Sequence, residues 1–459
     1  MSAATQAQAL TSTPEESGVR IIKQIRSHAI CAWIPQVRVL VAAELRAQKT
    51  PVCILFVTLA ILIAASLLWS WTEQREHHTQ SHVPPESIGK SVVGESHRFA
   101  LFARGAEDEL SGTYDLGAAN SPIRALSTAD TVNPLSALMT VKDPSDVIRV
   151  VFALLAMLIG FSSMVRERQC GTLKLLVSNG VSPRVFVASK WLGNVCLIGV
   201  PIVALAIVGV LVRPDNGARD KEELVALLLI LGCIWLYGGI FIALGLWAGA
   251  ASLTVKKSLI VAIQTWLLLT IIIPQLSWGL ATWIRPPITR LGVDIRAARI
   301  RIANIQAAND EVRKATNGSG FAATAIYARY EGDTARYIDQ AEITYATRLA
   351  RTIDIARWFA RLSPSSCVTF AQTALVGTGV DAALQFRMQL LTLKRRTVAI
   401  TLSNRNLPKA RWHPAPAPTS IIVPFDRFLG AGFDMVMLVA YLGLAAILAC
   451  RSIARLDLR

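Results

Sequence analysis

The sequence predicts an all-α membrane protein with six transmembrane helices and a helical hairpin inserted between spans five and six. First, 53% of its 459 residues are hydrophobic and the mean hydropathy is +0.45, whereas soluble domains contain roughly 45–50% apolar residues. Second, six apolar stretches are long enough to cross a bilayer. Third, long polar stretches separate span one from span two and span five from span six.

The six predicted spans are residues 51–71, 147–164, 186–212, 224–250, 258–284 and 428–450. Basic residues flank alternate ends of these spans, among them Lys256, Lys257 and Arg451. Because cytoplasmic loops carry an excess of Lys and Arg, both termini are expected in the cytoplasm. The outer loop 72–144 and the outer helical region 288–426 then lie on the far side of the membrane, and a cytoplasmic tail (451–459) ends the chain.

Residues 1–50 are expected to form a cytoplasmic tail that ends in an amphipathic helix. Between residues 33 and 49, the apolar residues Val37, Leu40, Val41 and Leu45 fall on one helical face. A helix of this kind lies in the plane of the membrane interface. It would run into the first span.

The large outer region carries two series of apolar residues at helical spacing. The first series is Leu291, Ile295, Ala298, Ile302, Ile305 and Val312; the second is Ile338, Ala341, Tyr345, Thr352, Ile355, Phe359 and Leu362. An Asn-Gly-Ser-Gly turn at 317–320 lies between them. The pattern predicts an antiparallel helical hairpin whose single seam is formed by these two series. A further helix is expected at about 381–400.

A coupling segment at 165–185 stands out between spans two and three. It places Arg166, Glu167 and Arg168 where span two ends, and Ser182-Pro183 reads as the N-cap and first residue of the next helix. The pattern consists of Arg166, Glu167, Gly171, Thr172, Leu173, Leu176 and Ser178, followed by Ser182, Arg184 and Lys190. It resembles the coupling segment of type-2 ABC transporter permeases, with Pro183 inserted before Arg184.

The resemblance implies a six-span permease subunit of an ATP-driven exporter in the bacterial inner membrane. Its implied partners are a cytoplasmic ABC ATPase, which binds ATP and Mg, and a second permease chain in a homodimer or heterodimer. Membrane lipid and a periplasmic protein are further expected partners. The ATPase-coupling residues would be Arg166, Glu167, Arg168, Gly171, Thr172, Leu173 and Leu176, together with Glu44 and Arg46 of the amphipathic helix. An alternative for Glu167 is pairing with Arg166 or Arg168 in solvent.

Uncharged polar residues inside the spans are candidates for a substrate path. They are Ser162, Ser163, Asn194, Gln264, Thr265, Thr270 and Gln275. Such groups inside a bilayer face other helices or a cavity. Five glycines in span four include Gly245-x-x-x-Gly249, a spacing that favours close helix packing.

Other functions find little support in the sequence. The net charge of +16 is not accompanied by the aromatic–basic interleaving that stacks nucleic-acid bases. Residues 84–91 lack the first glycine of a P-loop, and no hydrolase or zinc motif occurs. His77, His78 and His82 form a cluster of a kind that can bind copper or zinc, but a solvated stretch beside the membrane is the preferred interpretation, and no metal site is expected. The remaining alternative is a membrane-anchored scaffold or sensor whose hairpin binds a protein.

Overall fold

The computed structural model describes residues 37–44, 91–93, 103, 105–106, 110, 113–115, 124–125, 144–172, 176, 181–211, 220–251, 254–315, 320–404 and 425–455. Several predictions therefore lie outside the described residues. They concern the first span (51–71) and the individual residues Arg46, His77, His78, His82 and Leu173.

Helices dominate the described residues. In chain order they are a helix at 37–44, α6 (Pro144–Val147), η3 (Ile148–Phe152), α7 (Ala153–Gln169), α9 (Pro183–Leu211), α10 (Asp220–Ala251), α11 (Val255–Leu267), η5 (Leu268–Ile272), α12 (Ile273–Ile284), α13 (Arg290–Lys314), α14 (Gly320–Ala360), α15 (Pro364–Val376), α16 (Val380–Asn404) and α17 (Phe425–Ala454). Three short strands, β1 (Ser91–Val93), β2 (Thr113–Asp115) and β3 (Arg124–Ala125), form an antiparallel sheet in that order. Ser91 pairs with Asp115, and Tyr114 with Ala125.

Five helical segments are long and apolar enough to cross a membrane. They are Ser145–Gln169, Pro183–Val203, Glu223–Ala251, Val255–Ile284 and Phe428–Ala454. These segments overlap the second to sixth predicted spans. A sixth candidate is the bent pair Pro364–Val376 and Val380–Ile400, whose two helices meet at 44°.

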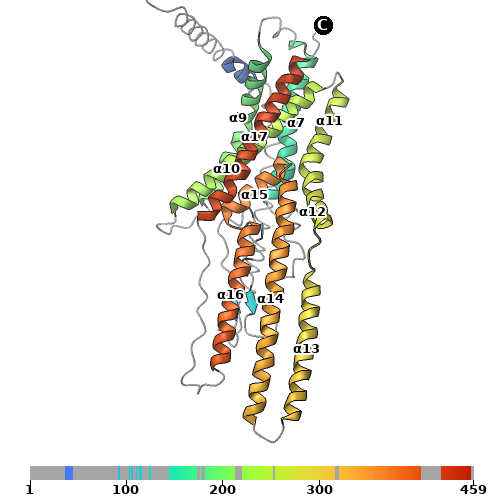
Figure 1. The fold of residues 1–459 in the computed structure, drawn as a ribbon. Coiled ribbons are helices and arrows are strands. Elements are labelled where there is room, and N and C mark those ends of the chain that lie inside the picture. Colours follow the sequence, from blue (N-terminus) through green and yellow to red (C-terminus); the bar gives the residue numbers. More distant parts are fainter. Residues whose placement is uncertain are drawn as a thin grey trace, which may run out of the picture.

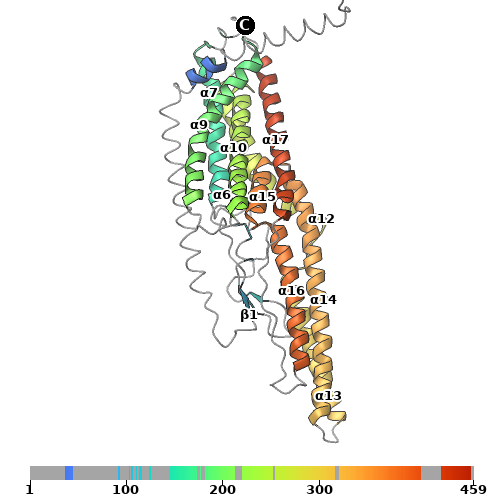
Figure 2. The ribbon, with the colours of Figure 1, turned by 90° about the vertical axis from the view of Figure 1, so that its left-hand side faces the viewer.

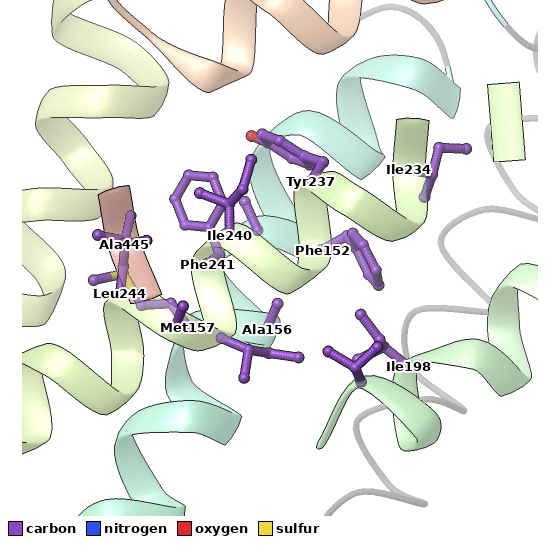
Figure 3. Packing of buried hydrophobic residues seen from close by; sticks show 14 of the residues in the cluster. Phe152, Ala156, Met157, Ile198, Ile234, Tyr237, Ile240, Phe241, Leu244 and Ala445 are labelled. Carbon is purple, nitrogen blue, oxygen red and sulfur yellow. The ribbon is translucent and has the colours of Figure 1, made fainter. Parts of the chain in front are cut away.

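Helix α10 lies at the centre of the bundle. It is apolar around its whole circumference, which is typical of a helix that other helices surround, and α7, α9, α11, α15 and α17 pack against it. Figure 3 shows Tyr237 and Phe241 of α10 among Phe152, Met157 and Ile198, which come from η3, α7 and α9. The edge-to-face contact between Tyr237 and Phe241 has ring centroids 4.9 Å apart.

Glycines allow α7 and α10 to approach each other closely. A Cβ atom on Gly245 would lie 2.1 Å from the backbone oxygen of Met157, and one on Gly160 would lie 2.3 Å from that of Ile242. A Cβ on Gly249 would lie 2.8 Å from Cβ of Met164. The predicted close packing at Gly245-x-x-x-Gly249 is therefore confirmed.

Helix α15 is an element that the sequence analysis did not anticipate. Ser363 caps it, Pro364 occupies its first turn, and Gly377 ends it with a left-handed φ of 89°. Nearly all of its residues are buried against α10 and α17. The region predicted to lie outside the membrane therefore sends a short helix back into the bundle of spans.

The two π-helical turns free backbone carbonyls inside the bundle, and side chains from other elements satisfy them. In η3, the Tyr237 hydroxyl donates to the Arg149 carbonyl at 2.7 Å, and Trp266 Nε1 donates to the Val150 carbonyl at 3.2 Å. In η5, the Ser363 hydroxyl donates to the Leu269 carbonyl. These bonds tie α15 and α10 to irregular turns of two spans.

Helices α13 and α14 form the antiparallel hairpin. Asn304 Nδ2 donates to Thr334 Oγ1 at 2.7 Å, and the Tyr327 hydroxyl donates to Asn309 Oδ1 at 2.8 Å. At the base, Arg290 Nη1 donates to Glu342 Oε2 at 2.7 Å. Burial lowers the pKa of Arg290, but the hydrogen bond and charge of Glu342 outweigh this and raise it above its ordinary value. The Arg290 guanidinium therefore remains charged.

The predicted seam is wrong for α13 and largely right for α14. The α13 residues that are fully buried are Val293, Ala297 and Ala308, whereas Leu291, Ile295, Ile302 and Ile305 of the predicted series are exposed. On α14, Ile338, Tyr345 and Thr352 are buried as predicted. Helix α13 carries apolar residues on two opposite faces, and periodicity alone does not tell which face α14 covers.

The hairpin and the predicted coupling residues lie at opposite ends of the molecule. Helices α13, α14 and α16 extend from one end of the bundle in both views (Figures 1 and 2). The helix at 37–44, the end of α7, the start of α9 and the C-terminal end of α17 lie at the other end. Near the hairpin, the edge-to-face contact of Tyr114 with Phe386 joins β2 to α16.

Candidate coupling site at the end of the bundle

The connection from α7 to α9 has the N-cap that the sequence predicts at Ser182, and a left-handed glycine at its start. Gly171 follows the last turn of α7 with a φ of 72°, a conformation that favours glycine. Helix α9 begins at Pro183, and the Ser182 hydroxyl accepts a hydrogen bond from the Val185 backbone N–H at 3.4 Å. These caps fix where each helix ends, and so they position the charged residues that flank the connection.

Glu44 is the centre of a buried ionic cluster at this end. Its carboxylate, which is inaccessible to solvent, accepts a hydrogen bond from the Ser163 hydroxyl at 2.6 Å. It also pairs with Arg166 Nη2 at 3.2 Å and with the Lys190 ammonium. The helix at 37–44 is thereby joined to both α7 and α9.

Lys190 also pairs with the carboxylate of Glu167, so one ammonium group lies between two carboxylates. The Thr172 hydroxyl donates to the same Glu167 carboxylate. The Lys190 side chain is 4% exposed and that of Glu167 is 17% exposed. Two carboxylates face one ammonium and one guanidinium, which balances the charge of the cluster and offsets part of the cost of its burial.

Arg168 extends the connections to a fourth element. Its Nη1 donates to the Gly249 carbonyl at 2.7 Å, close to the C-terminal end of α10. Carbonyls at a helix C-terminus lack intrahelical partners, and cations are favourable there. The end of α7 therefore contacts the helix at 37–44, α9 and α10 through charged side chains.

The structure brings together most of the predicted coupling residues that it describes. Glu44 and Glu167 both pair with Lys190, while Arg166 binds Glu44 and Thr172 binds Glu167. Lys190 belongs to the sequence pattern of the coupling segment but not to the predicted ATPase-coupling residues. Leu176 is half-buried against the main core. A Cβ atom on Gly171 would meet nothing within 4 Å, so this turn faces open space. Glu167 is paired internally with Lys190, whereas the sequence suggested Arg166 or Arg168 as its neighbours.

The predicted substrate-path residues do not form one cluster. Ser163 belongs to the ionic cluster, and Ser162 is exposed and donates to the Ile159 carbonyl of its own helix. Asn194 and Thr270 are buried; the side-chain nitrogen and oxygen of Asn194 have no hydrogen-bond partner among the described residues.

The other path residues lie on the span formed by α11, η5 and α12. Gln264 and Gln275 are exposed, and the half-buried Thr265 donates to the Val261 carbonyl. The buried polar residues Ser365, Ser366 and Gln372 of α15 were not anticipated. The Ser363-Pro364 cap marks where α15 begins, but nothing in its composition tells that it returns to the bundle.

No group of three or more His, Cys, Asp or Glu among the described residues is placed to hold a metal ion. The long apolar helices define a multi-pass, α-helical membrane protein. A family model described as ABC-2 family transporter protein matches residues 49–328, which is more than half of the chain. The chain therefore belongs to the ABC-2 family and is a type-2 permease component of an ABC transporter. A comparison with curated proteins finds no match.

Proposed function

We propose that this chain is the membrane subunit of an ATP-driven exporter of the bacterial inner membrane. A separate ABC ATPase, which binds ATP and Mg²⁺, docks on the segment between α7 and α9. A second permease chain completes the path for the substrate. Export, rather than import, follows from the resemblance of the coupling segment to that of type-2 permeases.

The observation that carries this proposal is the cluster of Glu44, Lys190 and Glu167. The docking segment lies between Glu167 and Lys190 in the chain, and these two residues form an ion pair. Through Lys190 the same pair reaches Glu44 on the helix at 37–44. Force that the ATPase applies to the docking segment therefore reaches α7, α9 and the helix at 37–44 together. Packed helices joined in this way can switch between two arrangements.

The distribution of basic residues supports a cytoplasmic position for this end. Besides Arg166 and Arg168, the residues Lys256, Lys257, Arg451 and Arg455 lie at the ends of α11 and α17 that point the same way (Figure 1). The positive-inside rule favours the cytoplasm for such an end. The hairpin then extends into the periplasm, and both termini lie in the cytoplasm.

The exposed face of α11, η5 and α12 supports pairing with a second permease. Gln264, Leu268, Ile271 and Gln275 recur on this face at spacings of four and three residues, and all four are exposed. A glutamine side chain that faces lipid leaves its amide without a partner. A second permease chain on this face would cover the two amides or place them along a path between the copies.

The test is purification of the tagged full-length chain from its native membranes, followed by mass spectrometry of the proteins and small molecules that accompany it. We expect an ABC ATPase, and we expect ATP hydrolysis by the complex but not by the chain separated from it. Hydrolysis by the separated chain, or purification at full yield without any ABC ATPase, contradicts the proposal. Bound small molecules would identify the substrate class.

A further inference from the structure

Helix α13 has two apolar stripes on opposite faces, and only one of them is covered. Val293, Ala297 and Ala308 pack against α14. Leu291, Ile295, Ile302 and Ile305 face away from it, and Leu291 is 68% exposed and Ile302 57% exposed. An exposed row of large aliphatic side chains on a helix that extends beyond the spans (Figure 1) indicates an interaction surface.

The exposed stripe has the spacing of a coiled coil. Leu291, Ile295, Ala298, Ile302 and Ile305 follow one another at steps of four and three residues, and all five are exposed. Further along the helix, Asn309 accepts a hydrogen bond from Tyr327 of α14 and Val312 is half-buried, so the stripe ends at Ile305. In heptad notation, Ile295 and Ile302 occupy a positions, and Leu291, Ala298 and Ile305 occupy d positions. A β-branched residue at a with leucine at d favours a two-stranded parallel coiled coil, and here both a positions are isoleucine and the first d position is Leu291.

The charges of the residues beside the stripe are complementary when two copies of α13 lie side by side in parallel. In a parallel pair, the g position of one helix meets the e position five residues further along the other helix. Asp294 is at g and Arg299 is at e, so each carboxylate meets the guanidinium of the other copy. Asp294 is part-exposed and lies 3.8 Å from Arg290 of its own chain. The next such pair, Arg301 with Gln306, brings no like charges together.

The stripe also continues an exposed surface of the preceding span. Helices α12 and α13 both pack against α14, so their faces away from α14 lie on the same side. On α12 this face includes Leu276 and Trp283, and Trp283 is 84% exposed. Figure 1 shows α11, α12 and α13 along one edge of the molecule. The surface assigned above to a second permease therefore extends from the span onto the hairpin.

We propose that α13 forms a parallel, two-stranded coiled coil with α13 of a second copy of this chain over residues 291–305. The inference rests on the proposed pairing of permeases and specifies that the second permease is an identical chain. A stripe of about two heptads gives little stability to a free dimer. Pairing of the spans supplies a high effective concentration, which allows so short a coil to form.

The test uses full-length chains with two different tags in the same membranes and a short thiol-specific cross-linker. Ile302→Cys places a thiol at an a position, whereas Ala303→Cys places it on the adjacent exposed residue outside the stripe. We expect a cross-linked dimer from Ile302→Cys, and from Ala303→Cys no more product than the native cysteines give. Cells that express Leu291→Cys and Ile305→Cys on differently tagged copies test orientation, because only an antiparallel pair brings these two ends of the stripe together.

Each outcome decides between the proposals. An Ile302→Cys dimer without an Ala303→Cys dimer supports the coiled coil. If the two tagged chains copurify but Ile302→Cys gives no dimer, the coiled coil is overturned while pairing of the spans stands. If the tagged chains do not copurify, both the pairing of the spans between identical chains and the α13 coiled coil are overturned. Cross-linking of Ile302→Cys to a different polypeptide, or of Leu291→Cys to Ile305→Cys, also overturns the coiled coil.

Discussion

Arg361, which follows α14, and Asp434 of α17 form a bidentate ion pair. Arg361 Nε donates to Asp434 Oδ1 at 2.7 Å, and Nη2 donates to Oδ2 at 3.1 Å. The guanidinium lies 4.5 Å from the ring centroid of Phe433, and the Arg361 carbonyl accepts from the Tyr441 hydroxyl at 2.7 Å. This arrangement fixes the hairpin to the last span at the point where α15 enters the bundle.

Arg361→Met is expected to destabilise the protein because it leaves the Asp434 carboxylate, which is 3% exposed, without its partner. Removal of one member of a buried pair costs about 3–5 kcal/mol. Thermal unfolding in detergent measures the change as a lower Tm. The control is Arg336→Met, since Arg336 is exposed and makes only a 3.7 Å contact with Asp333.

The double variant Arg361→Met/Asp434→Leu removes both charges and should recover most of the loss. If the double variant unfolds at the same temperature as the single variant, the lost packing of the guanidinium on Phe433 matters more than the ion pair.

Gly245→Ala is expected to weaken the packing of α7 on α10, because the added methyl group would collide with the Met157 backbone oxygen. Overpacking of this kind costs about 1–3 kcal/mol. Gly232→Ala on the same helix is the matched control, since a Cβ there meets nothing within 4 Å. We expect a lower Tm for Gly245→Ala, and for Gly232→Ala an unchanged or higher Tm because alanine favours the helix. Equal Tm values for both variants would contradict the close approach.

Much of the fold follows from hydropathy, and the parts that do not follow have physical reasons. Ser182-Pro183 fixes the start of α9 because a cap is a local interaction. Helix α15 combines apolar and hydroxyl residues in a short stretch, which suits a surface helix as well as a buried one. The sequence also does not tell which of two apolar faces of α13 packs on α14, because both have the same period.

The buried ionic cluster of Glu44, Lys190 and Glu167 shows a similar limit to what the sequence predicts. The pattern around Glu167 predicts a charged surface at the end of a span, and Glu44 was expected to belong to it. That Lys190 lies between these two carboxylates depends on the distance between the helix at 37–44 and α9, which the chain order does not supply. Lys190 stands about two turns inside α9, and its place in the sequence pattern says nothing of this contact.

The orientation of the hairpin is expected to be periplasmic. An engineered Asp310→Cys, on the exposed side of α13 near the hairpin tip, should react with a membrane-impermeant maleimide in intact spheroplasts. Lys257→Cys, at the opposite end of the molecule, should react only after the membrane is opened. Reaction of Asp310→Cys from the cytoplasmic side alone would contradict the topology.

Lys190→Met is expected to abolish coupling while the chain still inserts. Without the ammonium group, the Glu167 and Glu44 carboxylates face each other across a buried methionine, and breaking such a pair costs about 3–5 kcal/mol. ATP hydrolysis by the copurified complex should lose its dependence on substrate. Lys257→Met removes an exposed lysine at the same end and should leave hydrolysis unchanged. Full coupling in Lys190→Met would remove Lys190 from the transmission path.

The final prediction separates docking from internal positioning at Glu167. Glu167→Arg places a third cation beside Lys190 and Arg166, and it breaks the link between the end of α7 and α9. The new cation repels Lys190 and Arg166 and so displaces the docking segment between α7 and α9, which weakens ATPase docking indirectly by an amount on the order of 2–5 kcal/mol. We expect recovery of the ATPase with Glu167→Arg to fall strongly at matched membrane levels, and transport to be lost.

The isosteric variant Glu167→Gln distinguishes the two roles. The amide keeps the hydrogen bond with Thr172 but loses the ionic attraction to Lys190. If Glu167 acts by holding Lys190, Glu167→Gln and Lys190→Met should impair coupling alike while the ATPase remains bound. If Glu167 contacts the ATPase directly, Glu167→Gln should lower ATPase recovery and Lys190→Met should not. Because the structure directs the Glu167 carboxylate toward Lys190, we expect the first result. Equal ATPase recovery with unchanged transport in Glu167→Arg, Glu167→Gln and Lys190→Met would leave Glu167 without a role in coupling.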